Sequence, residues 1–127
     1  MTDCLDSWAV LRWLEGEEPA ASRVESAMQA RPLMSWINLG EVAYVVERLA
    51  GEDRARHAVR ELRRNVALEL PTQARVLEAA RIKANHSMAY ADAFALATAI
   101  AHGATLLTGD PEILDGTTRW PTEDLRR

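Results

Sequence analysis

Apolar residues follow two patterns that alternate along this sequence. In the longer segments they recur every three or four residues, as in Leu39, Val42, Val46 and Leu49, which is the spacing of one helix face. Between these segments stand short apolar runs bounded by Pro, Gly or Asn, which are typical of buried strands. The predicted strands cover residues 2–5, 33–37, 66–70 and 104–107. The predicted helices cover residues 7–15, 20–30, 39–50, 54–65, 73–84 and 89–101.

Residues that favour helix ends stand at the borders of these segments. Asn38, Asp53 and Thr72 carry side chains that accept hydrogen bonds from the free N–H groups of a first helical turn. Each of them is therefore predicted to cap the helix that follows it. Gly51 and Gly103 are the expected helix stops, because glycine readily adopts the left-handed conformation found at helix ends.

The alternation of strands with helices predicts the fold class. Such an order requires crossover connections, which join parallel strands of one sheet that is covered by helices on both faces. The sequence therefore predicts an α/β protein with a central parallel sheet of four to five short strands. The fifth strand is expected at the sheet edge near Arg119 and Trp120, and a turn is expected at 108–111. A length of 127 residues suits a single domain, residues 1–127.

Composition and charge exclude several classes of function. Cys4 is the only cysteine, which excludes a disulfide framework and a cysteine-based zinc site. No apolar run reaches the roughly 20 residues of a membrane-spanning helix, and the first residues do not resemble a signal peptide. A cytoplasmic protein without a membrane partner is therefore expected. The formal net charge of −4 argues against a protein that simply coats nucleic acid, but not against an enzyme whose carboxylates hold cations.

Three acidic residues stand near the predicted carboxyl ends of strands, where open parallel sheets bind their ligands. Asp6 follows the first strand, Glu41 lies early in the helix after the second strand, and Asp110 follows the fourth. Each of them also fits a purely structural role. Asp6 suits a helix cap and Asp110 suits a turn. Glu41 has the spacing of a capping box with Asn38.

Asp92 stands in a different setting, inside the apolar run YADAFALA at 90–97. A buried carboxylate without a partner is unfavourable or takes up a proton, so a compensating charge is expected. A cation shared with the other three acids would supply it, because repelling carboxylates tolerate one site when a hard cation lies between them. Mg²⁺ and Mn²⁺ take such oxygen ligands and retain water, which can attack a phosphodiester. The four acids therefore predict metal-dependent phosphodiester hydrolysis.

Four segments resemble, in order and interval, those of the PIN-domain ribonucleases, and among them the VapC-type toxins of bacterial toxin–antitoxin systems. The segments are LDSWAVL at 5–11, NLGEVAYVV at 38–46, YADAFALATA at 90–99 and LLTGDPEI at 106–113. The resemblance covers residues 5–114 and implies the three-layer PIN-like fold. The residues that it implies as catalytic and as ligands of Mg²⁺ or Mn²⁺ are Asp6, Glu41, Asp92 and Asp110. It also implies supporting hydroxyl groups at Ser7 and Thr108.

The same resemblance implies a function and partners. It implies an endoribonuclease toxin that hydrolyses RNA phosphodiester bonds through a metal-activated water. It further implies a homodimer and a small antitoxin protein that blocks the site. The sequence departs from the family in a first strand interrupted by Asp3 and Cys4, and at Trp8, where a small residue would be expected. These departures concern the rim of the pocket and not the four acids.

Other interpretations stay open at this point. A phosphatase with an Asp-x-Asp nucleophile would need an acid in place of Trp8, and a phospho-acceptor domain leaves Glu41 and Asp92 unexplained. The main alternative is a non-catalytic PIN-like module that binds protein or RNA, although such a module has no use for four acids that repel one another.

Two further features have two interpretations each. The basic segment 48–64 either contacts RNA phosphates or forms a solvated helix face with internal ion pairs. Glu112 and Asp115 either add outer ligands beside Asp110 or solvate the turn that follows it.

Overall fold

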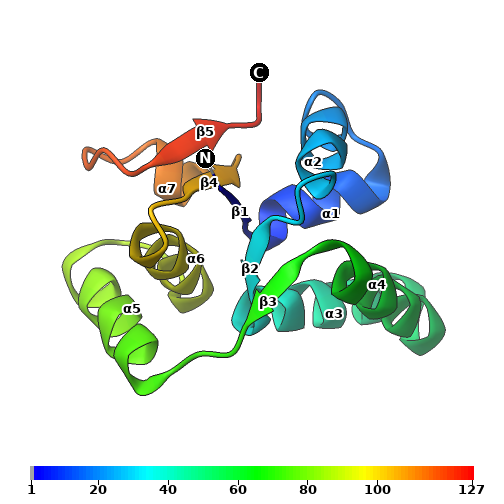
Figure 1. Ribbon diagram of the computed structural model, residues 1–127, viewed down its shortest axis with the longest axis horizontal. Helices are drawn as coiled ribbons and strands as arrows, with labels where there is room; N and C mark the ends of the chain where they lie inside the picture. The colour runs from blue at the N-terminus through cyan, green and yellow to red at the C-terminus, as the bar shows by residue number, and fades with distance from the viewer. Residues whose placement is uncertain (1) are drawn as a thin grey trace.

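The computed structural model describes residues 2–127 and contains a five-stranded sheet in which all neighbouring strands are parallel (Figure 1). The order β3-β2-β1-β4-β5 places β1 at the centre of the sheet. The strands are β1 (Asp3–Leu5), β2 (Leu33–Ser35), β3 (Ala67–Glu69), β4 (Thr105–Thr108) and β5 (Thr122–Asp124). The predicted α/β class with a parallel sheet is therefore confirmed.

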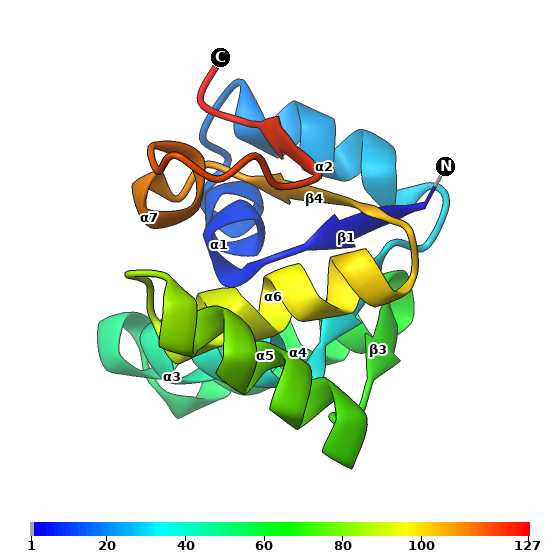
Figure 2. The same cartoon turned by 90° about the vertical axis from the view of Figure 1, so that its left-hand side faces the viewer.

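Helices cover both faces of this sheet in the described part of the chain. They are α1 (Ser7–Glu15), α2 (Ala20–Met28), α3 (Trp36–Ala50), α4 (Glu52–Asn65), α5 (Gln73–Asn85), α6 (Tyr90–Ala101) and α7 (Pro111–Leu114). Because successive side chains of a strand point to opposite faces, Cys4 packs with α6 whereas Leu5 packs with α1 to α4. Figure 2 shows α5 and α6 on one side of β1 and β4, and α1 and α2 on the other.

Helix α6 is the central helix of the fold. Its residues 92–99 are all buried, and it contacts β1, β2, β4, α3 and α5. Half of these residues are alanines, whose small side chains allow close approach to neighbouring elements. The apolar run around Asp92 therefore forms the central helix, and the aspartate enters the core in the first turn of α6.

Two helices begin earlier than the sequence predicts. Helix α3 begins at Trp36, and the side chain of Ser35 caps it by accepting from the N–H of Ile37 at 3.1 Å. The predicted cap Asn38 is wrong, because Asn38 is a fully buried residue inside the helix. Likewise Asp53 lies in the first turn of α4 and does not cap it. Apolar residues that continue past β2 resemble a longer strand, which is why the sequence misplaced this border.

The other borders agree more closely with the prediction. Thr72 caps α5 through its side chain, and Gly51 and Gly103 follow α3 and α6 with positive φ. The fifth strand exists at the predicted edge, but at β5 instead of near Arg119 and Trp120. The expected turn at 108–111 leads directly into the short helix α7. Among the described residues, no helix has the length and apolar character needed to cross a membrane.

Candidate functional site

The carboxyl ends of β1 and β4 lie side by side, because Leu5 pairs with Leu107. Asp6 and Thr108 are the next residues, and the Thr108 hydroxyl donates a hydrogen bond to Oδ2 of Asp6. Oδ1 of Asp6 accepts from the N–H of Ala9 at 2.8 Å, so Asp6 does cap α1. Asp6 is only 1% exposed. Since a carboxylate oxygen has two acceptor positions, the capping role leaves Asp6 free to bind a cation as well.

Helix α3 brings Glu41 to the same edge, because it begins directly after β2. Oε1 of Glu41 accepts a hydrogen bond from the Ser7 hydroxyl, which links α3 to the start of α1. Asn38, one turn earlier, donates from Nδ2 to the carbonyl oxygen of Ala91 at 3.0 Å. Asn38 therefore holds α3 against the first turn of α6, next to Asp92. The capping-box interpretation is wrong, since Asn38 does not cap α3.

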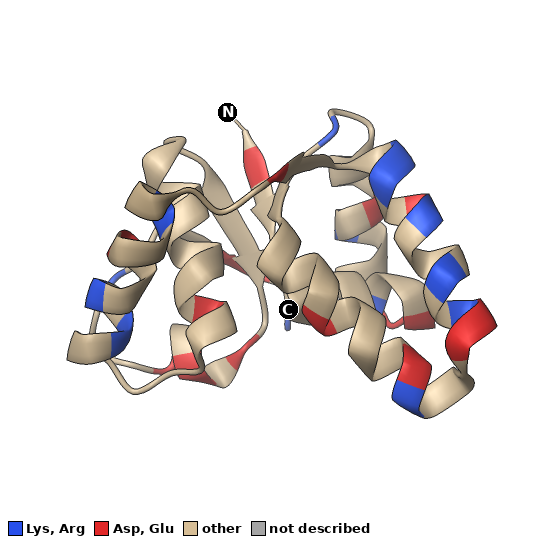
Figure 3. Cartoon of the chain, turned by 90° about the horizontal axis from the view of Figure 1, so that it is seen from below, with Lys and Arg blue, Asp and Glu red and all other residues tan. Residues whose placement is uncertain are grey.

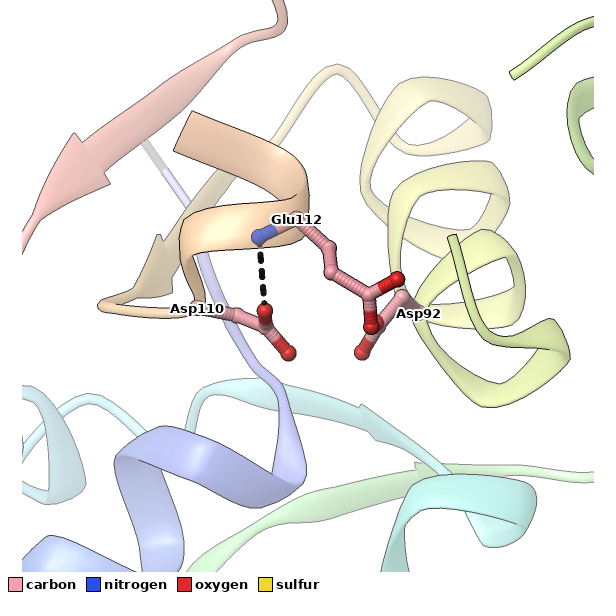
Figure 4. Close-up of side chains that lie close together, drawn as sticks. All are labelled: Asp92, Asp110 and Glu112. Carbon is pink, nitrogen blue, oxygen red and sulfur yellow. Dashed lines mark hydrogen bonds between the residues drawn. The ribbon is translucent and has the colours of Figure 1, made fainter. Parts of the chain in front are cut away.

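Carboxylates from α6 and from the start of α7 face a common space (Figure 4). One ligand oxygen from each of Asp92, Asp110 and Glu112 lies within 4.8 Å of the others. Asp110 caps α7, with Oδ1 accepting from the N–H of Glu112 at 2.9 Å. The N–H of Asp110 donates to the hydroxyl oxygen of Thr108 at 3.0 Å. The single hydroxyl of Thr108 therefore connects Asp110 to Asp6.

Glu112 joins this cluster and Asp115 does not. Asp115 instead forms an ion pair with Arg126, with 3.1 Å between Oδ1 and Nη2. The only sequence signal for Glu112 was its position two residues after Asp110. Its reach toward α6 depends on how α7 packs, which no local pattern shows.

Burial and mutual repulsion favour the protonated forms of two of these acids. Burial raises the pKa of Asp6 to about 7, and the charges of Asp110 and Glu41 add to the effect, while two hydrogen bonds oppose it. Burial raises the pKa of Asp92 to about 8, and the charges of the other three acids contribute. Such interactions require proximity, so the structure brings the four acids predicted from sequence close together.

Cations of the protein do not neutralise this pocket. Within residues 2–127, no ion pair joins Lys, Arg or His to Asp6, Glu41, Asp92, Asp110 or Glu112. The donor set consists of carboxylate oxygens with hydroxyl groups beside them. Hard divalent cations such as Mg²⁺ and Mn²⁺ prefer ligands of this kind.

The basic residues of α4 follow one another along this helix (Figure 3). Arg56 forms ion pairs with Glu52 at 2.8 Å and with Asp53 at 2.6 Å. The guanidinium carbon of Arg63 lies 5.9 Å from the ring centroid of Trp36. The pairs of Arg56 favour the solvated-face interpretation for the first turns of the helix, and contact with RNA stays a prediction.

Fold and site together define the class of this protein: a parallel α/β domain with a cluster of acids at the carboxyl edge of its sheet. The chain belongs to the PIN domain family, whose sequence profile matches residues 4–116. A search of curated proteins finds no match.

Solved structures with the same fold include chains of VapBC toxin–antitoxin complexes. VapBC2 from Rickettsia felis, bound to a DNA fragment from its promoter, is 14% identical with a TM-score of 0.76 and 98% coverage of both chains. VapBC-1 from nontypeable Haemophilus influenzae is 19% identical with a TM-score of 0.74 and full coverage of both chains. Mycobacterium tuberculosis VapC20, described as a Sarcin-Ricin loop cleaving toxin, is 17% identical with a TM-score of 0.71, covering 87% of this chain and 91% of VapC20. At these identities the likeness establishes the fold.

Proposed function

We propose that this chain is a divalent-metal-dependent endoribonuclease of the VapC type that hydrolyses RNA phosphodiester bonds. The observation that carries the proposal is a group of acids at the carboxyl edge of the sheet. Ligand oxygens of Asp92, Asp110 and Glu112 lie within 4.8 Å of one another, and the charges of Asp6 and Glu41 also act on Asp92. Acids that repel one another so strongly are costly to fold unless a function requires them. Membership of the PIN domain family supports the same conclusion.

The residues of the pocket fit a Mg²⁺ or Mn²⁺ ion. The four acids would hold it, and the position of Glu112 makes it an additional ligand candidate. Near this cluster, Oδ1 of the buried Asn38 has no hydrogen-bond partner among the described residues, so a water molecule brought by a cation would satisfy it. When bound, the ion would lower the pKa of the attacking water and offset the charge of the phosphodiester.

Side chains of the protein position the acids and exclude water from the site. Thr108 fixes Asp6 and Asp110 relative to each other through one hydroxyl. Ser7 orients the carboxylate of Glu41. Asp6 and Asp92 are 1% and 5% exposed, so they bind in a pocket from which bulk water is largely excluded. Because their pKa values are raised, both acids release protons as a cation binds, which makes metal affinity increase with pH.

We further propose that a small antitoxin protein covers this site and that the chain forms a homodimer. Several structures with this fold are toxin–antitoxin complexes, including one from Klebsiella pneumoniae. Helix α3 also exposes large apolar side chains, with Leu49 81% and Tyr44 49% exposed. Apolar surface of this kind is typical of protein–protein contacts.

The deciding experiment is cleavage of total cellular RNA by the purified chain, freed of any antitoxin, with Mg²⁺, Mn²⁺ or EDTA. We expect metal-dependent cuts at a few positions, which sequencing of the new ends would map. Asp110→Asn should reduce the rate more than about 100-fold, because even outer partners of metal ligands contribute 10–100-fold.

Asp115→Asn is the matched control, since it removes an acid of the same segment that pairs with Arg126 outside the pocket. It should cut RNA like the wild type. Cuts that persist in Asp110→Asn would contradict the assignment of the site. A folded, metal-binding wild type that cuts no RNA would instead favour a non-catalytic module that binds protein or RNA.

A further inference from the structure

The indole ring of Trp8 packs against the backbone of Gly109. A Cβ atom at residue 109 would lie 2.2, 2.4 and 2.5 Å from Cη2, Cζ2 and Cζ3 of Trp8. Near-equal distances to three adjacent ring atoms place that position over the face of the ring. Gly109 does not have the positive φ that favours glycine, so the obstacle to a Cβ atom at this residue is the ring of Trp8 and not the backbone conformation.

This contact joins two segments that carry the acidic pocket. Trp8 follows Asp6 and Ser7 at the start of α1, and Gly109 stands between Thr108 and Asp110. The hydroxyl of Thr108 already ties these segments together through Asp6. The ring adds a second attachment, on the backbone that leads from β4 into α7.

Trp8 is itself held in place. Its ring is half-buried against the core cluster that includes α1. The guanidinium carbon of Arg12 lies 4.5 Å from the ring centroid. Arg12 is in turn paired with Glu15 at 3.4 Å and with Glu17 at 3.3 Å. The ring therefore loses several contacts if it swings away from Gly109.

We propose that Trp8 is a positioning residue for the metal-binding carboxylates: by packing on Gly109 it fixes the turn that presents Asp110 and Glu112 to Asp92. This inference rests on the proposed function. The departure from the family at residue 8 thereby becomes part of how this chain builds its site. The ring at residue 8 takes this position because residue 109 has no Cβ atom.

The test compares Trp8→Ala, Gly109→Ala and the double variant, each prepared without metal. Mn²⁺ affinity is measured by calorimetric titration and stability by thermal unfolding in EDTA. Each single change should weaken Mn²⁺ binding about tenfold, as expected for partners that orient metal ligands. The double variant should recover most of the affinity, because the added methyl group occupies space that the ring has left.

Two controls separate positioning from packing. Trp13→Ala removes a second partly buried indole from α1, and Gly116→Ala adds a methyl group where nothing lies within 4 Å. Both should bind Mn²⁺ like the wild type, whatever they do to the unfolding temperature. Single variants at residues 8 and 109 that unfold earlier yet keep wild-type Mn²⁺ affinity would overturn the positioning role. A wild type that binds no Mn²⁺ would overturn the proposed function and this inference together.

Discussion

Two groups of carboxylates in this fold lie in opposite electrostatic settings. Glu69, at the end of the edge strand β3, accepts a hydrogen bond from Nε of Arg75 at 2.7 Å and also contacts His102. The bond from Arg75 lowers the pKa of Glu69. In the pocket beside α6, burial and neighbouring acids raise the pKa of Asp92 to about 8. The basic partners of Glu69 make it a structural carboxylate, whereas the pocket lacks such partners within the described residues.

The comparison teaches how to separate a structural acid from a functional one. A carboxylate that stabilises a fold is supplied with a cation from the same chain, since an unpaired buried charge is costly. A pocket that keeps acids without such partners is destabilised by them, and an external cation is the simplest compensation. The predictions that follow test this difference.

The largest expected effect comes from the hydroxyl that organises the pocket. Thr108→Val keeps the shape of this fully buried side chain but removes its hydrogen bonds with Asp6 and Asp110. Mn²⁺ affinity, measured by calorimetric titration, should fall about 10–100-fold. Thr98→Val is the control, because Thr98 is also fully buried and donates only to the carbonyl oxygen of Phe94. Equal losses in both variants would contradict a special role of Thr108.

The next effect is a fall in stability with rising pH. Asp6 and Asp92 have pKa values of about 7 and about 8 in the folded protein, far above the ordinary aspartate value of 3.8. At pH values between 3.8 and the raised pKa of each aspartate, the folded state binds a proton that the unfolded state has released. The stabilisation is therefore complete below about pH 4 and is lost as the pH rises toward 8.

This pH dependence can be measured by chemical unfolding from pH 5 to pH 8.5 in EDTA. In Asp92→Asn, the free energy of unfolding should fall less steeply with pH. At high pH it should exceed the wild-type value by about 1 kcal/mol, which corresponds to roughly one pKa unit. Millimolar Mn²⁺ should reverse the fall in the wild type and not in Asp92→Asn. An Asp92→Asn variant less stable than the wild type at pH 8 would show that the buried charge is compensated within the chain.

The periodic patterns predicted the order of elements and the parallel sheet, which the structure confirms. They also predicted that acids at the carboxyl ends of the strands lie near one another, since these ends share one edge whatever the details of packing. The role of these acids as metal ligands stays a prediction. The border between β2 and α3 was misplaced because Trp36 and Ile37 extend an apolar run, while the short side chain of Ser35 decides where the helix begins.

Contacts between segments that lie far apart in the sequence could not be predicted from local patterns. The hydrogen bond from Asn38 to Ala91 and the packing of Trp8 on Gly109 depend on how α3, α6 and α7 are oriented in space. Glu112 belongs to the same group, since only the position of α7 turns it toward Asp92. The sequence therefore predicts candidate ligands of the site, whereas the contacts that support them depend on the tertiary structure.

The smallest expected effect tests the structural acid of the comparison. Glu69→Gln removes the charge that pairs with Arg75, and should lower the free energy of unfolding at pH 7 by about 0.5 kcal/mol, as for a partly exposed pair. Because the folded-state pKa of Glu69 is lowered, its stabilisation exists above the unfolded value and disappears on acidification. Glu78→Gln, which removes the more exposed partner of the same Arg75, should cost less. Mn²⁺ affinity should be unchanged in both variants, and a loss of affinity in Glu69→Gln would mean that the two groups of carboxylates are coupled through the buried helix α6.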